Sequence, residues 1–273
     1  MVAAGRDPLR VIVAGAAGRM GKRLIQLIAE APDLVLAGAI EHAGHGALGR
    51  DAGEEAGVGV LKVPLSSDLQ AAAGQGDVLL EFSVPAATLE HLRIAVRAKL
   101  AAVLGTTGYN EAQQRELTEL GRATRCLVAP NMSVGVNVLF SIVERMARLL
   151  GPGFDLEVLE MHHRMKKDAP SGTAVRLGEI LAAAAGRSYR DVAVCGRQGM
   201  VGARTEAEIG LMALRGGDVA GDHTVYFIGQ GERLEVTHRA HSRDTFAHGA
   251  LRAVRWLVQQ PVGLYSMKDV LGL

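Results

Sequence analysis

Residues 11–21 read VIVAGAAGRMG, an apolar run that leads into a turn with three glycines, Gly15, Gly18 and Gly21. Apolar residues at helical spacing follow, and a second apolar run, Leu34–Ile40, ends at Glu41. A strand, a glycine-rich turn, a helix, a second strand and an acidic residue form the order of a dinucleotide-binding βαβ unit. We therefore predict that this part of the chain binds a dinucleotide.

Within this unit we expect the turn and Glu41 to contact the cofactor. Small residues let the backbone approach the pyrophosphate, and the N-terminus of the following helix faces its negative charge. The Glu41 carboxylate would accept hydrogen bonds from the adenosine ribose. The predicted cofactor-binding residues of the turn are Gly15, Ala16, Ala17, Gly18, Arg19 and Met20.

Further strands alternate with helices as far as residue 132. Apolar runs at Val78–Phe82, Ala102–Leu104 and Cys126–Ala129 are typical of buried parallel strands, so we predict an α/β fold with a doubly wound parallel sheet. Ligands bind at the carboxyl ends of such strands, although residues of these types are also common in plain turns. The two candidate loops contain Gly105, Thr106 and Thr107, and Ala129, Pro130, Asn131 and Met132. The glycine-rich segment 42–60 is predicted to be a long surface loop.

The stretch 160–174, EMHHRMKKDAPSGTA, concentrates positive and titratable side chains before a predicted helix. Ser171 is placed to cap that helix, and the backbone amides of Gly172 and Thr173 at its start would bind an anion. Two His, one Arg and two Lys lie within six consecutive positions beside it. The stretch therefore predicts a site for a small, multiply anionic ligand with proton-transferring groups nearby.

After residue 133 the pattern changes. We expect a helix over 134–150, then strands at 154–162, 192–194, 209–215, 223–229 and 233–239, several of which alternate apolar and polar residues as in a sheet buried on one face. By the same alternation, Glu160 and His162 share one face of their strand and His163 lies on the other. These segments predict a second, α+β domain built on a mixed or antiparallel sheet, followed by a helix over 245–259.

Composition narrows the kind of protein. The chain has 273 residues, 48% of them apolar, and a formal net charge of +1, which argues against bulk binding to nucleic acid or an anionic membrane. No run approaches the ~18 apolar residues of a membrane span, and Met1–Pro8 reads as a loose leader. Two cysteines, Cys126 and Cys195, suggest a reducing, cytoplasmic location. No metal site is predicted, because the His residues near position 42 lack ligand spacing.

The stretch 160–174 resembles the signature of the 4-hydroxy-tetrahydrodipicolinate reductase family, long called dihydrodipicolinate reductase, of bacterial lysine and diaminopimelate biosynthesis. The glycine-rich turn and the two strand-end loops match this family too, so the resemblance covers nearly the whole chain. It implies hydride transfer from NADH or NADPH to a cyclic hydroxy-tetrahydropyridine dicarboxylate, with loss of water. It also implies that the loops at 105–107 and 129–132 line the nicotinamide half of the cofactor.

The resemblance assigns further roles. His162 is expected to donate or accept a proton and Lys166 to donate one, whereas His163, Gly172 and Thr173 are expected to bind the dicarboxylate. The sheet of the second domain is expected to mediate a homotetramer. The last segment of the family returns to the first domain, so we predict a dinucleotide-binding domain at 1–132 plus 243–273 and a substrate-binding and oligomerisation domain at 133–242.

One position departs from the family. There, a basic residue after the acidic one favours the 2′-phosphate of NADP, but here that position is His42, which is weakly basic and shorter than Arg. We therefore expect NADH to serve at least comparably with NADPH.

Three other functions fit parts of the pattern. Another two-domain nicotinamide oxidoreductase of aspartate-family metabolism, such as a homoserine dehydrogenase relative, would lack the double His and the Pro-Ser-Gly-Thr turn. A non-enzymatic dinucleotide-sensing regulator would not need the His-His-x-x-Lys cluster. A zinc hydrolase is disfavoured because adjacent His residues on a strand point apart.

Overall fold

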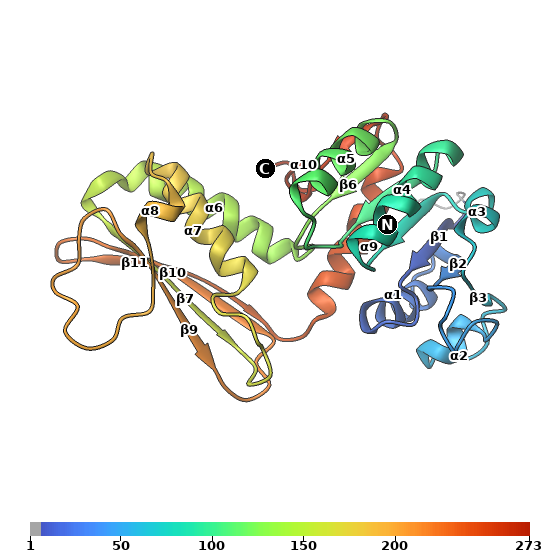
Figure 1. Cartoon of the computed structure of the whole chain (residues 1–273), viewed down its shortest axis with the longest axis horizontal. Helices are drawn as coiled ribbons and strands as arrows, with labels where there is room; N and C mark the ends of the chain where they lie inside the picture. The colour runs from blue at the N-terminus through green and yellow to red at the C-terminus, as the bar shows by residue number, and fades with distance from the viewer. Residues whose placement is uncertain (1–6) are drawn as a thin grey trace. The chain divides into compact units, whose positions relative to one another are not determined.

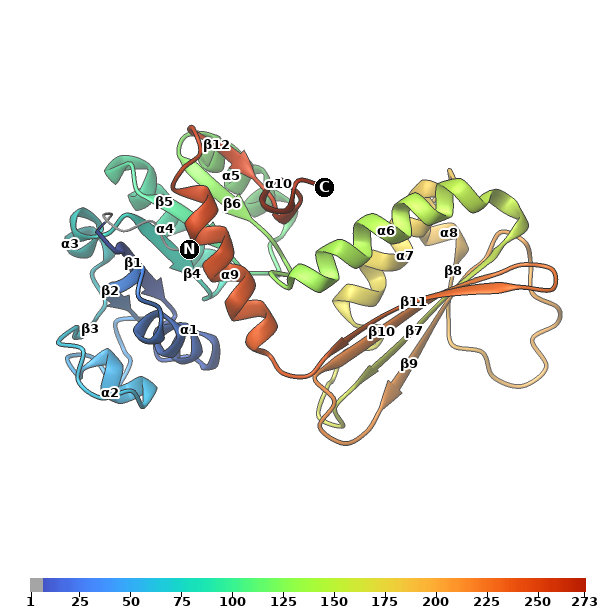
Figure 2. The ribbon, with the colours of Figure 1, turned by 180° about the vertical axis from the view of Figure 1, so that it is seen from behind.

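The computed structural model describes residues 7–273, so most of the leader predicted at Met1–Pro8 lies outside the described residues. The chain forms two compact units, which Figures 1 and 2 show from opposite sides. Unit 1 contains the chain up to Ser133 together with Phe246–Gly272. Unit 2 contains Val134–Thr245 and Leu273.

Unit 1 is built on a seven-stranded sheet in the order β12-β6-β5-β4-β1-β2-β3, and all neighbouring strands are parallel. The predicted parallel sheet is therefore confirmed. Strand β5 is buried at every residue, which is why it reads as an unbroken apolar run. The strands are β1 (Leu9–Ala14), β2 (Leu34–Ile40), β3 (Leu65–Ser66), β4 (Val78–Glu81), β5 (Ala101–Leu104), β6 (Arg125–Val128) and β12 (Gly263–Tyr265).

The helices of unit 1 cover both faces of this sheet. Helices α4 and α5 pack on one face, where Leu92 and Leu117 join the strands in one apolar core, and Figures 1 and 2 show α9 on the other. At Gly249, α9 passes so close to the Met132 carbonyl that a Cβ would collide with it. The helical segments are α1 (Arg19–Glu30), α2 (Ala52–Ala56), α3 (Leu69–Ala72), η1 (Ala73–Gln75), α4 (Pro85–Ala98), α5 (Glu111–Arg122), α9 (Asp244–Leu257) and α10 (Met267–Leu271).

The prediction of one long loop over residues 42–60 is wrong in part, because the segment contains α2. Asp51 organises it: its carboxylate accepts hydrogen bonds from the amides of Gly53 and Glu54 and, further along, of Leu61 and Val63. Strands β3 and β12 and helix α10 were not predicted either. Each is too short for a periodic pattern to show.

Unit 2 contains a five-stranded mixed sheet in the order β11-β10-β7-β9-β8. Strand β10 pairs antiparallel with both β7 and β11, whereas β9 pairs parallel with both β7 and β8. Helices α6 and α7 form an apolar core with one face of the sheet. The elements are α6 (Val134–Leu150), η2 (Gly151–Gly153), β7 (Asp155–His162), α7 (Gly172–Ala184), α8 (Tyr189–Val192), β8 (Ala193–Cys195), β9 (Ile209–Arg215), β10 (Gly221–Ile228) and β11 (Arg233–Ala240).

The strand register in unit 2 gathers polar residues at one end of the sheet. Buried and half-buried residues alternate along β7. Glu160 and His162 share one face of the strand as predicted, and this face is the buried one. Glu160 is paired with His223 on β10, and His162 is paired with Arg215 on β9. Residues far apart in the sequence thereby meet at the carboxyl end of β7.

Candidate active site

The glycine-rich turn of unit 1 lies between β1 and α1. Gly15 has a positive φ of 73°, and a Cβ there would lie 2.5 Å from the Phe82 carbonyl oxygen, so only glycine fits. Gly18 is the N-cap of α1 and provides no side chain to cap the helix. The start of α1, with Arg19 and Met20 in its first turn, therefore offers its backbone to an anion.

Glu41, at the end of β2, holds the same turn. Its carboxylate accepts hydrogen bonds from the amides of Ala17 and His42, both at 3.1 Å. A carboxylate has about four acceptor positions, so Glu41 can still accept bonds from ribose hydroxyls. His42 is exposed and its ring meets that of His45 edge to face at 5.3 Å.

A hollow of about 760 Å³ adjoins this turn, lined among others by Gly15, Gly18, Glu41 and Ser83. Sequence reasoning missed a polar cluster at its wall. Buried Glu81, the last residue of β4, accepts a hydrogen bond from Ser83 Oγ at 2.5 Å and lies 2.6 Å from His91 Nδ1. Burial lowers the pKa of His91. The hydrogen bond to Glu81 and the negative charge of Glu81 raise it by more, so the pKa lies above the ordinary value.

The two predicted strand-end loops lie side by side in unit 1. Gly105–Thr107 follows β5, and Ala129–Met132 follows its neighbour β6, with the Ala129 amide bonded to the Leu104 carbonyl at 3.0 Å. The buried Thr106 hydroxyl accepts a hydrogen bond from Thr88 Oγ1 at 2.9 Å. These loops lie at the same edge of the sheet as the glycine-rich turn, because all the strands are parallel.

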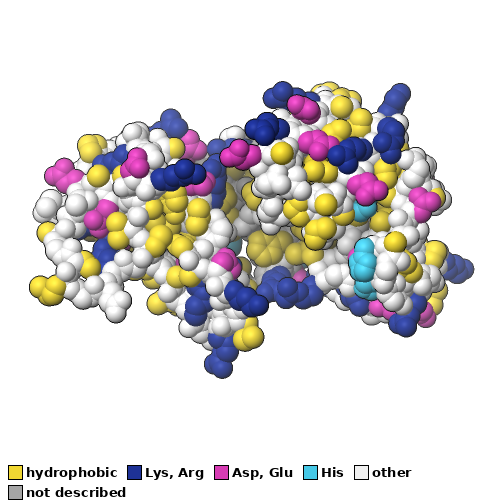
Figure 3. All heavy atoms as spheres, in the orientation of Figure 1, with side chains coloured by type: hydrophobic (Ala, Val, Ile, Leu, Met, Phe, Trp, Pro, Cys, Tyr) yellow, Lys and Arg dark blue, Asp and Glu magenta, His cyan; other side chains and the backbone are white. Residues whose placement is uncertain are grey.

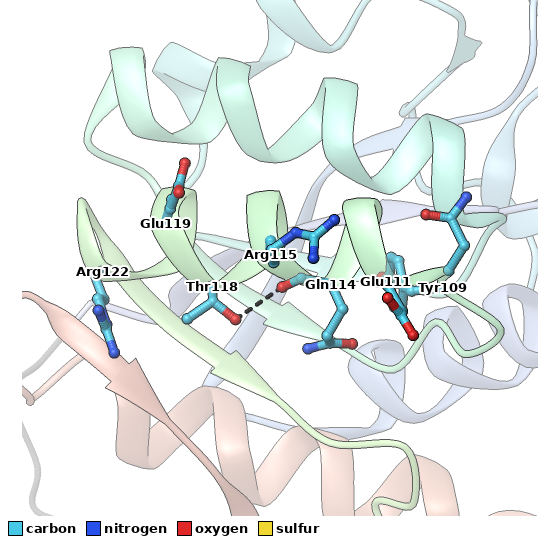
Figure 4. Close-up of a pocket in the computed structure, with 8 residues that line it drawn as sticks. Tyr109, Glu111, Gln114, Arg115, Thr118, Glu119 and Arg122 are labelled. Carbon is cyan, nitrogen blue, oxygen red and sulfur yellow. Dashed lines mark hydrogen bonds between the residues drawn. The ribbon is translucent and has the colours of Figure 1, made fainter.

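A second hollow in unit 1, about 640 Å³ in volume, runs along α5 (Figure 4). It is lined by exposed side chains such as Gln114 and Arg122, and Thr118 Oγ1 donates to the Gln114 carbonyl at 2.8 Å. None of the predicted site residues lines it. We assign it no role.

In unit 2, the fully buried carboxylate of Glu160 lies at the centre of what we call the His162 cluster (Glu160, His162, Ser171, Arg215 and His223). Glu160 Oε2 lies 2.6 Å from His162 Nδ1. The Arg215 guanidinium donates to both carboxylate oxygens, at 2.7 and 2.8 Å. The Ser171 amide donates to Glu160 Oε1 at 3.0 Å.

Ser171 links this cluster to α7. As predicted, it is the N-cap: its Oγ accepts from the Ala174 amide at 3.2 Å. The same Oγ lies 3.0 Å from His223 Nε2. His223 is buried, and its Nδ1 has no hydrogen-bond partner in the described part of the chain. Gly172 and Thr173, the first residues of α7, follow directly.

His163 and Lys166 both lie in the loop between β7 and α7. Lys166 is largely buried, and its Nζ pairs with the exposed Asp168 carboxylate at 2.9 Å. His163 Nε2 lies 3.3 Å from the Arg243 guanidinium, a residue that sequence reasoning did not single out. Figure 3 shows Lys and Arg side chains gathered over this end of unit 2, where Arg164 and Lys167 are exposed.

The charges of the His162 cluster set its protonation. Burial alone would raise the pKa of Glu160, but hydrogen bonds from Arg215 and His162 lower it below the ordinary value, so the carboxylate is ionised. Burial, together with the positive charges of Lys166 and Arg215, lowers the pKa of His162 despite the opposing effect of Glu160. The cluster therefore combines a neutral imidazole with a nearby ammonium group, which suits proton transfer to and from an anionic ligand.

The sequence signals for the residues that were missed are weak. Glu160 belongs to the motif at 160–174, but the sequence alone indicates no role for it. His223 lies on the same buried face of its strand as Val225 and Phe227, but Arg215 shows no pattern until the parallel pairing of β7 with β9 is known. Among the described residues, no cluster of His, Cys, Asp and Glu could hold a metal ion, and no helix has both the length and the apolar character to cross a membrane.

Two family profiles match the chain. The profile for the N-terminus of dihydrodipicolinate reductase matches residues 9–132, and that for its C-terminus matches residues 135–271. Curated relatives include the 4-hydroxy-tetrahydrodipicolinate reductases of Syntrophotalea carbinolica, 52% identical, and Geotalea uraniireducens, 49% identical. Each alignment covers 97% of this chain and 99% of the relative.

Solved structures show the same fold. A dipicolinate-bound dihydrodipicolinate reductase from Paenisporosarcina sp. TG-14 superposes with a TM-score of 0.73 at 24% identity and covers 96% of this chain and 98% of its own. An amine dehydrogenase from Mycobacterium smegmatis gives a TM-score of 0.58 at 14% identity, with 95% of each chain covered. At these identities the likeness concerns the fold alone.

The buried His223 predicts that unit 2 loses stability in acid. Burial and the neighbouring His162 lower the pKa of His223 to about 3, whereas a histidine in the unfolded chain has a pKa of about 6.5. Between these values only the unfolded chain binds the proton, so the free energy of unfolding falls as pH falls, by up to about 1.4 kcal/mol per pH unit. We expect His223→Gln to remove this part of the pH dependence.

Urea unfolding of both proteins at pH 7, 6 and 5 measures the effect. The wild type should be more stable than the variant at pH 7, and the gap should narrow on acidification. The exposed His241 provides a control, because His241→Gln should leave the pH dependence unchanged. Parallel stability curves for wild type and His223→Gln would contradict the prediction.

Proposed function

The chain belongs to the dihydrodipicolinate reductase family, and we propose that it reduces a cyclic 4-hydroxy-tetrahydropyridine dicarboxylate to tetrahydrodipicolinate, using NADH or NADPH. The family consists of NAD(P)H-dependent oxidoreductases of lysine and diaminopimelate biosynthesis. The observation that carries the proposal for this chain is the His162 cluster, where a buried, neutral imidazole and Lys166 stand near the N-terminus of a long helix.

We assign cofactor binding to unit 1. Helix α1 begins directly after the glycine-rich turn without a side-chain cap, which leaves its first backbone amides to a pyrophosphate. Glu41 would accept hydrogen bonds from the adenosine ribose. The turn residues from Gly15 to Met20 would contact the pyrophosphate, and the Gly105–Thr107 and Ala129–Met132 loops would contact the nicotinamide half.

We assign substrate binding to unit 2. A dicarboxylate needs positive charge and donors, and the start of α7 supplies the positive end of a helix dipole at Gly172 and Thr173. His163, which is close to the Arg243 guanidinium, would bind the same ligand. The domains expected from the sequence are a cofactor domain at 1–132 plus 243–273 and a substrate domain at 133–242, whereas the compact units divide at 133/134 and 245/246, which places Arg243 in unit 2.

The chemistry requires two proton movements. Loss of the 4-hydroxyl as water needs a proton, which Lys166 can donate, and loss of hydrogen from the neighbouring ring carbon needs a base, which neutral His162 can supply. When bound, the reduced nicotinamide supplies the hydride for the carbon that carried the hydroxyl. The electron pair then left on the ring is quenched by a proton, which His162 can return.

We further propose that the protein forms a homotetramer through the outer face of the unit 2 sheet. Helices α6 and α7 cover the opposite face (Figures 1 and 2). Partly exposed apolar side chains from three strands gather on the outer face: Leu159, Met161, Met212, Leu214, Tyr226 and Ile228. An apolar face of this kind on an open sheet is a typical association surface.

A cytoplasmic location also follows from this function. The reaction consumes a reduced nicotinamide cofactor, and both cysteines are free, as is usual in a reducing compartment. Immunoblotting of cell fractions tests it.

A coupled assay tests the reaction and the cofactor together. Pyruvate and aspartate semialdehyde are condensed to form the substrate, and nicotinamide absorbance is followed with each reduced cofactor. Because His42 replaces a longer basic side chain, kcat/KM with NADH is expected to be at least comparable with that for NADPH. A preference for NADPH of more than about 100-fold, roughly 2.7 kcal/mol, would contradict this expectation, and no oxidation of either cofactor would reject the function.

Lys166→Ala is expected to lower kcat by about 10²- to 10⁴-fold, the usual contribution of a positioned general acid. Cofactor affinity and thermal stability should stay near wild type, because Lys166 lies in a loop and pairs with an exposed carboxylate. The exposed neighbour Lys167 offers a matched control, and Lys167→Ala should retain wild-type turnover. Equal losses in both variants would indicate that only the local charge matters.

The assembly proposal predicts that Leu214→Glu lowers the molar mass measured by light scattering below that of a tetramer. Leu214 is 46% exposed on the outer face of the sheet, where a buried carboxylate in an interface would be costly. Val60, 63% exposed in unit 1, provides the control: Val60→Glu should not change the mass. A monomeric wild type would refute the proposal.

A further inference from the structure

We propose that Glu160 and Arg215 are positioning residues that fix the tautomer, orientation and charge of His162. The proposal rests on the role given above to His162 and extends it to two residues with no assigned function. Neither residue is expected to touch the substrate. Both act through contacts with the imidazole and with the start of α7.

The hydrogen bonds of Glu160 leave its carboxylate no freedom. It is fully buried and takes four of them, from His162 Nδ1, from two Arg215 nitrogens and from the Ser171 amide. Four bonds account for about all the acceptor positions of a carboxylate. The side chain is therefore saturated and cannot turn without breaking a buried bond, which would cost about 1–3 kcal/mol.

This arrangement selects one tautomer of His162. An ionised carboxylate only accepts hydrogen bonds, so the 2.6 Å contact requires the proton to be on His162 Nδ1. In the neutral ring, Nε2 then carries the lone pair. A Cβ at Gly221 would lie 2.9 Å from this Nε2, so glycine at that position leaves the reactive nitrogen without a side chain against it.

Arg215 keeps the carboxylate charged and anchors the loop that carries Lys166. Its guanidinium pairs with Glu160 and also donates to the Asp168 carbonyl at 2.6 Å. One side chain thus ties the end of β9 to Glu160 and to the loop before α7. The Ser171 amide, bonded to the same carboxylate, fixes the imidazole relative to the helix start.

The charged and titratable groups around His162 are few and lie on separate elements. Glu160 precedes it on β7, Arg215 ends β9, His223 meets its ring edge to face at 5.1 Å from β10, and Lys166 lies in the following loop. Glu160 raises the pKa of His162, whereas Lys166 and Arg215 lower it. Removing the carboxylate or the guanidinium should therefore move the titration of His162 in opposite directions.

The experiment compares pH profiles of kcat for wild type, Glu160→Gln and Arg215→Gln. Glu160→Gln is expected to lower kcat by about 100-fold, as loss of a carboxylate that orients a histidine typically does, and to move the limb that titrates His162 to lower pH. Arg215→Gln is expected to move the same limb to higher pH. Neither should change KM for the reduced cofactor.

If the two residues had a merely structural role, each variant would yield less folded enzyme, but the limb of the pH profile that titrates His162 would not move in either variant. The control is Glu157→Gln on the same strand: this carboxylate also pairs with two arginines, Arg197 and Arg204, but lies on the other face of β7. It should leave the pH profile unchanged. In a His162→Asn background, Glu160→Gln should cost less than threefold further, because its effect passes through His162.

A readout independent of turnover separates this proposal from the proposed function. Nitrogen-15 NMR of labelled histidines, with His162 assigned by its loss in His162→Asn, should show the proton on Nδ1 in wild type and on Nε2 in Glu160→Gln. An unchanged tautomer in Glu160→Gln, or unmoved limbs in both variants, would overturn the positioning role even if the reductase assay succeeds. If Glu160→Gln does not fold, Arg215→Gln alone decides the outcome.

Discussion

The ion pair between Glu160 and Arg215 is the constraint on which the polar end of unit 2 depends. A buried carboxylate without a partner would be costly or would become protonated, and here the guanidinium of Arg215 and the Ser171 amide prevent both. Because the partners come from three separate elements, the pair also joins β7, β9 and the start of α7. Because the Glu160 carboxylate is fixed in this way, its hydrogen bond with Nδ1 also fixes the imidazole of His162.

In unit 1 the predicted site depends on backbone geometry, whereas the His162 cluster of unit 2 depends on charge. The parallel strands of unit 1 bring the glycine-rich turn, Glu41 and the two strand-end loops to one edge of the sheet, and glycine at position 15 lets the turn pack directly against the Phe82 carbonyl. A dinucleotide requires many weak contacts along its length. A single reacting ring requires few contacts, placed accurately. The cofactor and substrate sites proposed for the two units would meet these separate demands.

The sequence predicted the parallel sheet, the second mixed sheet and the N-cap at Ser171, because each has a local pattern of apolar spacing or capping chemistry. It did not predict α2, β3, β12 or α10, which are too short for periodicity. The partners of His162 show the limit more clearly. Arg215 is distant in sequence and lies beside Glu160 only through the pairing of β7 with β9, and no local signal encodes that register.

The order of the chain has a consequence for its synthesis. Strand β12 pairs with β6, and α9 supports the Met132 backbone through the close approach at Gly249, yet β12 and Gly249 come after nearly all of unit 2 in the sequence. While the ribosome is still making residues 134–245, the nascent first unit therefore has an unpaired sheet edge and a sheet face on which α9 has not yet packed. Unit 2 is nearly contiguous in sequence, so almost all of its strands and helices are available once residue 245 has been made. Unit 1 is begun first but is completed only after unit 2.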